Sequence, residues 1–112
     1  MKQIEELQQE IKEFCDERDW EQFHNAKDLA IGISTEAGEL LDLFRFKDSE
    51  EAFLNHRADI EEESADVFFF LLRFAQMNAI DLEEVLKRKL EKNAEKYPVD
   101  KAKGSNKKYN EF

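Results

Sequence analysis

Two pairs of acidic residues near the middle of the chain have a spacing suited to metal binding. Glu36 and Glu39 stand three residues apart, and Glu63 and Asp66 repeat that spacing further along. Residues three apart lie on one face of an α-helix, a single turn from each other, so each pair presents two carboxylates in the same direction. If the two helices pack side by side, all four carboxylates can meet at one site.

The residues around both pairs predict that they face the protein core. Apolar side chains share the face of each pair when positions are counted at roughly 100° per residue: Leu29, Ile33, Leu40 and Leu43 around the first pair, and Ile60, Val67, Phe70, Phe74 and Met77 around the second. Burying a carboxylate is costly unless a proton, a basic side chain or a metal ion neutralises it. Lys47 is the only Lys or Arg on these faces. A metal ion is therefore favoured over the alternative of solvated acidic surfaces.

The donor set indicates which metal to expect. Four carboxylates make an all-oxygen site, of the kind that binds Mg²⁺, Mn²⁺ or Ca²⁺. One or two Mg²⁺ ions held in this way can also bind a polyphosphate. Cys15 is the single cysteine, so a zinc site is not expected. We predict Mg²⁺ as the cofactor, with Mn²⁺ as a substitute.

The composition indicates one helical domain. Only three Gly and one Pro occur among the 112 residues, which favours long helices over a many-turned β fold. The net charge of −10 argues against a nucleic-acid partner, because non-specific binding of nucleic acid needs a cationic surface. The longest apolar run, residues 67–72, is far shorter than the roughly 20 residues of a membrane span. With a lone cysteine and no apolar signal segment, we expect a cytoplasmic protein that does not bind membranes.

Four helices are predicted, over about residues 2–17, 26–46, 56–78 and 82–96, within a single domain of residues 1–112. Asn25 and Asp81 are suitable N-caps for the second and fourth helices, and Pro98 ends the fourth. Residues 99–112 then form a basic tail. Phe68 and Phe69 make the third helix apolar on a second side, so we expect an oligomer to cover it.

Three other features of the predicted helices and their connections could contribute to a binding site. Trp20, Phe23 and His24 gather in the polar stretch between the first two helices, where aromatic side chains either stack on a ligand or close the end of the core. Gly32, on the face of Glu36, leaves room for a ligand or for another helix. A column of lysines runs beside the apolar stripe of the fourth helix: Lys89, Lys92 and Lys96.

Six short segments form an ordered pattern that covers nearly the whole chain: Arg18–His24, Glu36–Leu40, Phe44–Lys47, Glu62–Val67, Asn93–Pro98 and Gly104–Ser105. In type and order they resemble the all-α nucleoside triphosphate pyrophosphohydrolases of the MazG-like superfamily, most closely the dCTP pyrophosphatase branch. E-x-x-E alone is a weak motif, whereas the ordered set is specific. The resemblance implies a four-helix, all-α bundle that is completed by oligomerisation, as a dimer or a tetramer.

The resemblance also implies an activity and a site. Such enzymes use Mg²⁺ to cleave an NTP or dNTP between the α and β phosphates, giving a monophosphate and pyrophosphate. They remove unwanted nucleotides, which here would be dCTP or a related or modified nucleotide. Carried over by position, Glu36, Glu39, Glu63 and Asp66 match the metal ligands and the catalytic residues. The matching substrate contacts are Trp20, Phe46, Phe70, Lys89, Asn93, Lys96 and Tyr97.

Two substitutions separate this chain from the dCTP branch. Phe46 stands where Trp is typical and Phe70 where Tyr is frequent, and Phe70 lacks a hydroxyl that could contact the nucleotide. Because hydrogen-bonding sites discriminate between substrates more strongly than apolar ones, the preferred base stays open. Two other functions also stay open. One is a non-enzymatic helical interaction module whose acids pair with a basic partner. The other is a relative that binds nucleotides without hydrolysing them.

Overall fold

The computed structural model describes residues 2–111, and every regular element within that range is helical. Five α-helices follow one another: α1 (Lys2–Glu17), α2 (Ala26–Asp42), α3 (Ser49–Met77), α4 (Leu82–Lys96) and α5 (Val99–Ala102). Two short 3₁₀ turns, η1 (Glu21–Phe23) and η2 (Tyr109–Glu111), complete the order. The predicted all-α class is therefore confirmed.

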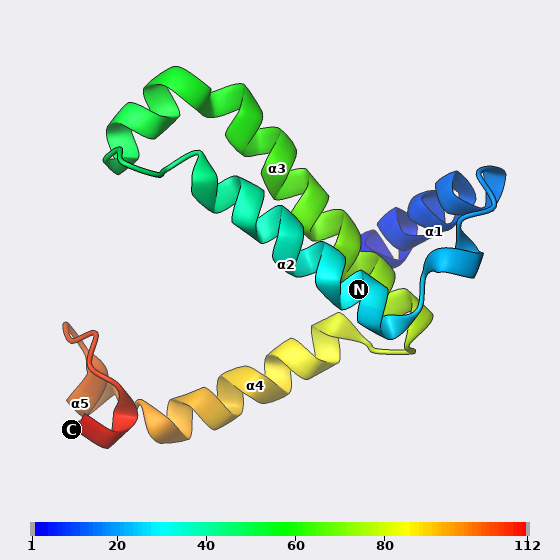
Figure 1. The fold of residues 1–112 in the computed structure, drawn as a ribbon. Helices are drawn as coiled ribbons and strands as arrows, with labels where there is room; N and C mark the ends of the chain where they lie inside the picture. Colours follow the sequence, from blue (N-terminus) through cyan, green and yellow to red (C-terminus); the bar gives the residue numbers. More distant parts are fainter. Residues whose placement is uncertain (1, 112) are drawn as a thin grey trace. The chain divides into compact units, whose positions relative to one another are not determined.

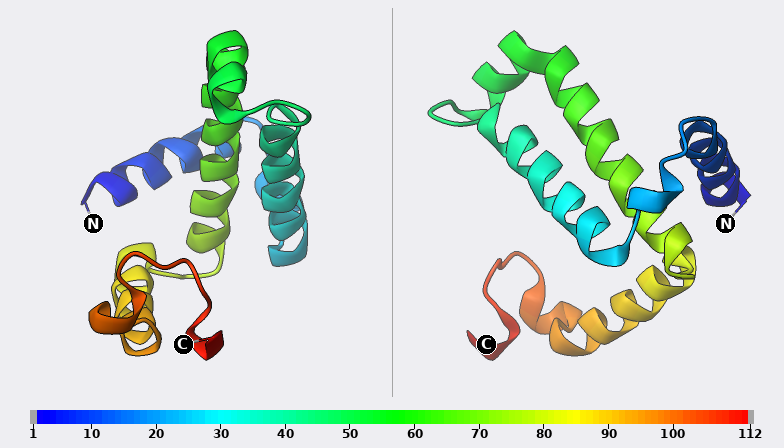
Figure 2. Two further views of the ribbon diagram at one scale, coloured as in Figure 1. Left: turned by 90° about the vertical axis from the view of Figure 1, so that its left-hand side faces the viewer. Right: turned by 45° about the vertical axis from the view of Figure 1, so that its right-hand side comes forward.

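The chain divides into two compact units, and the boundary between them follows Ile80. In the first unit α2 and α3 run antiparallel and side by side, and α1 packs across α3 (Figures 1 and 2). The amide of Gln8 on α1 donates a 3.0 Å hydrogen bond to the Leu72 carbonyl of α3. The buried core of this unit draws on all three helices: Cys15, Leu29, Ala52, Ile60, Leu72 and Ala75.

Side-chain caps explain where the helices begin. Asn25 accepts a hydrogen bond from the Asp28 backbone N–H, and Asp81 accepts one from that of Glu84, so both predicted N-caps are confirmed. The N-cap Asp48 was not predicted. Its carboxylate accepts from the Glu51 N–H, which starts α3 at Ser49, seven residues before the expected position. The predicted start, His56, is instead a kink with φ −134° and ψ 26°, which is visible as the bend in α3 (Figure 1).

The second predicted helix was too long at its C-terminal end. Helix α2 stops at Asp42 rather than residue 46, because residues 43–45 form tight turns in which each backbone N–H donates to the carbonyl three residues before it. Phe46 then has φ 62°, in the left-handed region that a helix cannot contain. The connection between α2 and α3 is thus short, and the two helices form a tight hairpin.

In the second unit α4 ends at Lys96, two residues before Pro98, as predicted. The basic tail contains the short helix α5, with Pro98 at its N-cap position. Tyr109 returns to the end of α4, where its ring centroid lies 6.0 Å from that of Tyr97 and 4.9 Å from the Lys96 ammonium. None of the helices that the structure describes combines the length and apolar character needed to cross a membrane.

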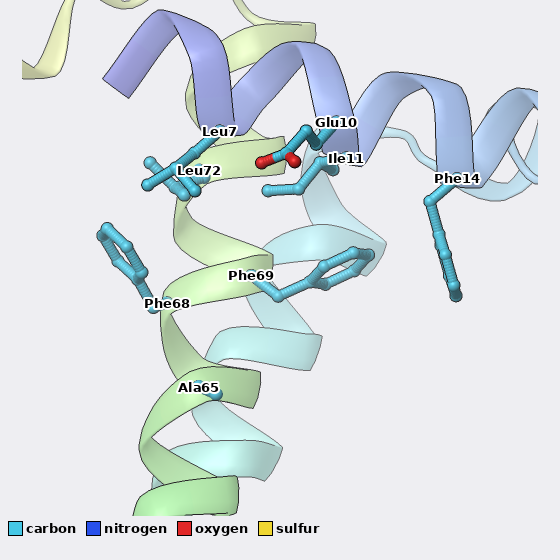
Figure 3. Close-up of a pocket in the computed structure, with 8 residues that line it drawn as sticks. All are labelled: Leu7, Glu10, Ile11, Phe14, Ala65, Phe68, Phe69 and Leu72. Atoms are coloured by element: carbon cyan, nitrogen blue, oxygen red, sulfur yellow. The ribbon is translucent and has the colours of Figure 1, made fainter. Parts of the chain in front are cut away.

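An apolar groove of about 350 Å³ runs between α1 and α3 in the first unit. Figure 3 shows its lining, with Leu7, Glu10, Ile11 and Phe14 from α1 lying above Ala65, Phe68, Phe69 and Leu72 from α3. Phe68 remains 43% exposed, and Phe14 and Leu7 are similarly open. The second apolar side that the sequence predicted for this helix is therefore only partly covered within the unit, since Phe68 is exposed whereas Phe69 is half-buried, with its ring centroid 6.3 Å from that of Phe14.

Candidate metal site

Three of the four predicted acids meet where α2 and α3 face each other. Glu36 and Glu39 come from successive turns of α2 and Glu63 from α3, and one carboxylate oxygen from each lies within 4.8 Å of the others. The antiparallel hairpin produces this meeting, because it places the middle of α2 against the middle of α3. We name these three residues the acidic cluster.

Two oxygens of the acidic cluster lack any hydrogen-bond partner among the described residues. Oε2 of Glu36 and Oε2 of Glu63 are both buried from solvent, yet neither accepts a hydrogen bond. An unsatisfied buried polar atom costs free energy, and a carboxylate oxygen costs more than a neutral one. Such orphaned oxygens are what an all-oxygen cation site offers before an ion binds.

The electrostatics of the cluster indicate a shortage of positive charge. Burial, followed by the neighbouring carboxylate of Glu39, raises the pKa of Glu36 to about 7. The same two causes, in the same order, raise the pKa of Glu63. Near neutral pH the cluster therefore shares protons, and a divalent cation would replace them with a stronger interaction.

Asp66, the fourth predicted ligand, lies at the rim of the cluster. It is one turn beyond Glu63 on α3, is exposed to solvent and falls outside the group of oxygens within 4.8 Å. Its negative charge nevertheless contributes to the raised pKa of both Glu36 and Glu63. Asp66 is thus close enough to interact electrostatically, and its role as a ligand stays a prediction.

Gly32 and Phe70 set the distance between the two helices. A Cβ added to Gly32 would lie 2.5 Å from Cδ1 of Phe70, so the Phe70 ring packs directly on the α2 backbone. Of the two uses predicted for Gly32, room for another helix is the one observed. Phe70 also makes an edge contact with Phe69, at 5.4 Å between ring centroids. Whether Phe70 touches a substrate stays a prediction.

The other two predicted aromatic contacts occupy connecting segments. Trp20 packs its edge against Phe14, at 5.6 Å between ring centroids, and leaves 39% of its surface exposed. The contact with Phe14 agrees with the interpretation in which Trp20 closes the end of the core, and its stacking on a ligand stays a prediction. Phe46 is 92% exposed on the α2–α3 connection, with the Arg45 guanidinium 4.9 Å from its ring.

The remaining predicted substrate contacts all belong to the second unit. Lys89, Asn93 and Lys96 recur at spacings of four and three along α4, so they share one face of that helix. The two lysines are exposed and Asn93 is half-buried. Tyr97 is the residue that ends α4, beside Tyr109. Their role in substrate binding stays a prediction.

One buried charge was not predicted from the sequence. Arg73 on α3 is only 2% exposed, and its Nε donates a 2.9 Å hydrogen bond to Nδ1 of His24. The signal in the sequence is its position between the apolar run of residues 67–72 and the apolar pair Phe74 and Ala75, where a solvated cation is out of place.

The fold and the acidic cluster define an all-α protein with a carboxylate centre in a helical hairpin. The family model described as MazG-like matches residues 31–112. The chain belongs to the MazG-like family. It is 34% identical over 114 residues to dCTP pyrophosphatase 1 of Bos taurus, covering 97% of this chain and 68% of that protein. The Homo sapiens dCTP pyrophosphatase 1 gives the same identity, with 67% of its length covered.

A solved structure agrees with this assignment. The crystal structure of a pyrophosphatase from Archaeoglobus fulgidus superposes on the chain with a TM-score of 0.82 and 40% sequence identity. The match covers 86% of this chain and 93% of the archaeal one. At that identity the likeness extends beyond the fold to the family, so it supports the sequence comparison independently.

Proposed function

We propose that the protein is a divalent-metal-dependent enzyme that hydrolyses a nucleoside triphosphate between its α and β phosphates, releasing a monophosphate and pyrophosphate. The observation that carries the proposal is the acidic cluster of Glu36, Glu39 and Glu63, with two buried oxygens that have no protein partner. In a MazG-like chain, that arrangement is suited to binding the cation that accompanies a triphosphate.

The enzyme class follows from the family. The chain is a nucleotide pyrophosphatase by its membership, since its named relatives are dCTP pyrophosphatases and a solved pyrophosphatase. The substrate within that class is part of the proposal: dCTP, or a related or modified nucleotide. Phe46 and Phe70 provide aromatic surface without a hydrogen-bonding group, so they favour stacking over strict reading of one base.

We propose Mg²⁺, replaceable by Mn²⁺, as the cofactor. Glu36, Glu39 and Glu63 would hold it, with Asp66 available from the rim. Their orphaned oxygens and all-oxygen donor set fit a hard divalent cation. When bound, the ion supplies Lewis-acid polarisation of phosphate oxygens and lowers the pKa of a coordinated water.

The protein's own residues would divide the remaining work. Glu36 or Glu39 would take the proton from the attacking water. Lys89 and Lys96 neutralise the β and γ phosphates as negative charge moves onto pyrophosphate. Trp20 and Phe46 would stack on the base, and Asn93 and Tyr97 would contact the base and sugar.

Self-association forms part of the proposal. The α1–α3 groove exposes Leu7, Phe14 and Phe68, which is unusual for a small unit that has to remain soluble alone. A second copy of the chain is the proposed cover, as a dimer or a tetramer. We expect the protein to act in the cytoplasm, on free nucleotides rather than on nucleic acid or membranes.

A pyrophosphate-release assay over a panel of dNTPs and NTPs with Mg²⁺ tests the function. Glu39→Gln and Asp66→Asn are each expected to lower kcat by roughly 100-fold, because each removes charge from the proposed cation site. Glu61→Gln is the matched control, since Glu61 is an exposed acid on α3 that pairs with Arg57 at 3.2 Å. Product analysis has to show monophosphate and pyrophosphate rather than diphosphate and phosphate.

Several outcomes separate the alternatives. Full turnover in Glu39→Gln, or activity that survives EDTA, contradicts the acidic cluster as the catalytic centre. An interaction module predicts neither metal binding nor a nucleotide-dependent shift in melting temperature. A non-hydrolysing relative predicts a higher melting temperature with Mg²⁺ and dNTP but no pyrophosphate.

A further inference from the structure

Arg73 is a buried cation for which no carboxylate among residues 2–111 serves as an ion-pair partner. Its guanidinium donates only to neutral acceptors, Nε to His24 Nδ1 at 2.9 Å and Nη1 to Gln76 Oε1 at 2.7 Å. A buried arginine without an anion is destabilising compared with an apolar residue of similar volume. Hydrophobic packing alone therefore gives no reason for an arginine at this position.

The hydrogen bond from Arg73 fixes the state of His24. Since Nδ1 accepts the bond, the imidazole is neutral and carries its proton on Nε2. Burial, followed by the charge of Arg73, lowers the pKa of His24 below its usual 6.5, which preserves this state near neutral pH. The His24 ring is thus held by one specific bond from α3.

His24 in turn contacts Trp20. The two ring centroids lie 6.5 Å apart in an edge-on contact, and Trp20 has Phe14 as a second aromatic neighbour at 5.6 Å. Backbone hydrogen bonds make the segment 20–24 one compact turn: Phe23 N–H donates to the Trp20 carbonyl and His24 N–H to that of Glu21. Fixing His24 therefore limits the movement of Trp20.

The guanidinium itself is oriented by a second set of bonds. Gln76, which accepts from Arg73, donates its amide to the Gln8 carbonyl at 2.9 Å, and Gln8 donates back to the Leu72 carbonyl at 3.0 Å. Both glutamines lie between α1 and α3, so Arg73 is aligned by the packing of these two helices.

We propose that Arg73 is a positioning residue, which acts through His24 to hold Trp20 in the orientation that receives the nucleobase. The proposal rests on the proposed function, in which Trp20 stacks on the base. Arg73 touches neither the substrate nor the acidic cluster in this scheme. Its loss is expected to weaken substrate binding and to leave the hydrolytic step intact.

Intrinsic fluorescence offers a direct test, because Trp20 is the only tryptophan. Arg73→Met replaces the cation with an apolar side chain of similar length and is not expected to unfold the protein. We expect a shifted Trp20 emission maximum and easier acrylamide quenching in Arg73→Met and in His24→Phe, which removes the acceptor. Arg57→Met, at an exposed arginine elsewhere on α3, is the control and should leave both signals unchanged.

Kinetics and pH supply readouts that a purely structural role would not change. Arg73→Met should raise KM roughly three- to tenfold with kcat within about twofold. In the wild type, lowering the pH protonates Nδ1 of His24, breaks the bond from Arg73 and changes Trp20 emission, and His24→Phe should abolish that transition. The other charged or titratable groups near Arg73, His24 and Trp20 are Arg18, whose guanidinium lies 3.7 Å from the Phe14 ring centroid, Cys15, whose pKa burial raises, and Lys12, whose pKa Asp16 raises, together with Asp16 and Glu21.

The outcomes distinguish this proposal from the proposed function. Unchanged emission and quenching in both variants overturn the positioning role, whatever the activity. A lowered melting temperature with unchanged KM in folded Arg73→Met also overturns it, because that result describes a structural residue. If the wild type releases no pyrophosphate from any nucleotide, the proposed function fails, and Trp20 emission alone then decides whether Arg73 positions it.

Discussion

The ring of Phe70 on α3 lies directly on the backbone of Gly32 on α2, where any side chain would collide with it. This contact sets the register of the hairpin. Glu36 follows Gly32 by one turn on the same face of α2, and Glu63 precedes Phe70 by two turns on the same face of α3. Because the helices are antiparallel, the Gly32–Phe70 contact brings these two carboxylates together.

Gly32→Ala is therefore predicted to destabilise the protein. The new methyl group would lie 2.5 Å from Cδ1 of Phe70, so the ring or the helix has to move. Overpacking of this kind typically costs about 1–3 kcal/mol. Urea denaturation, followed by far-UV circular dichroism, measures the loss directly.

Gly38→Ala is the matched control for that prediction. Gly38 lies in the same helix, but a Cβ at this position meets nothing within 4 Å. Replacing a helical glycine with alanine is expected to stabilise by about 0.5–1 kcal/mol when there is space for the methyl group. Equal effects of the two substitutions would contradict the close approach of Phe70.

Local signals made much of the fold predictable. Four apolar residues at helical spacing, Ile4, Leu7, Ile11 and Phe14, indicate α1 in the sequence, and Asn25 and Asp81 mark the starts of α2 and α4. The predicted start of α3 was wrong because residues 47–55 are mostly polar and lie outside the apolar pattern of the helix, and the cap at Asp48 was overlooked. The kink at His56 separates the short, polar first segment of α3 from its longer, apolar second segment. Apolar periodicity therefore detects only the segment after His56.

The site was predictable to the level of helix faces. Periodicity placed Glu36, Glu39 and Glu63 on facing sides, and the structure brings these three together. A helix-face argument cannot distinguish a carboxylate in the cluster from one at its rim, which is where Asp66 lies. Arg73 was missed for a different reason: its place among apolar residues signals burial, but its partner His24 is far away in the sequence and only the tertiary packing brings the two together.

Removing the overlooked cap gives a second prediction. Asp48→Ala deletes the carboxylate that accepts from the Glu51 N–H at 2.8 Å and leaves the first turn of α3 uncapped. The expected loss is about 0.5–2 kcal/mol of unfolding free energy. Asp48→Asn should retain most of that stability because its amide oxygen can still accept. If both variants lose the same unfolding free energy, the effect of Asp48 comes from its charge rather than from capping.

The raised pKa of Glu36 predicts an unusual pH dependence in metal-free protein. Its folded pKa of about 7 exceeds its ordinary value of 4.5, so between these values the folded state binds more protons than the unfolded state. Stability contributed by this group is therefore present at low pH and is lost as the pH rises through about 7. Melting temperatures in EDTA, from about pH 5 to about pH 8, measure it.

The control for this prediction is Glu36→Gln, which cannot titrate. His24 acts in the opposite direction, because its lowered pKa adds stability as the pH rises through the range below 6.5. The informative quantity is thus the difference in melting temperature between the wild type and Glu36→Gln at each pH. A difference that stays constant across the range would rule out an abnormal pKa at Glu36.

Metal addition should reverse that pH dependence. Protons and a divalent cation compete for the same oxygens of Glu36 and Glu63, so Mg²⁺ or Mn²⁺ is expected to raise the melting temperature more at about pH 8 than at about pH 5. At an ion concentration about 100 times the Kd, the stabilisation amounts to about 2.7 kcal/mol. Glu63→Gln should lose most of this gain, whereas Glu61→Gln, an exposed acid on the same helix, should keep it. If the metal-dependent shift is the same in both variants, the ion binds elsewhere and the acidic cluster is not its site.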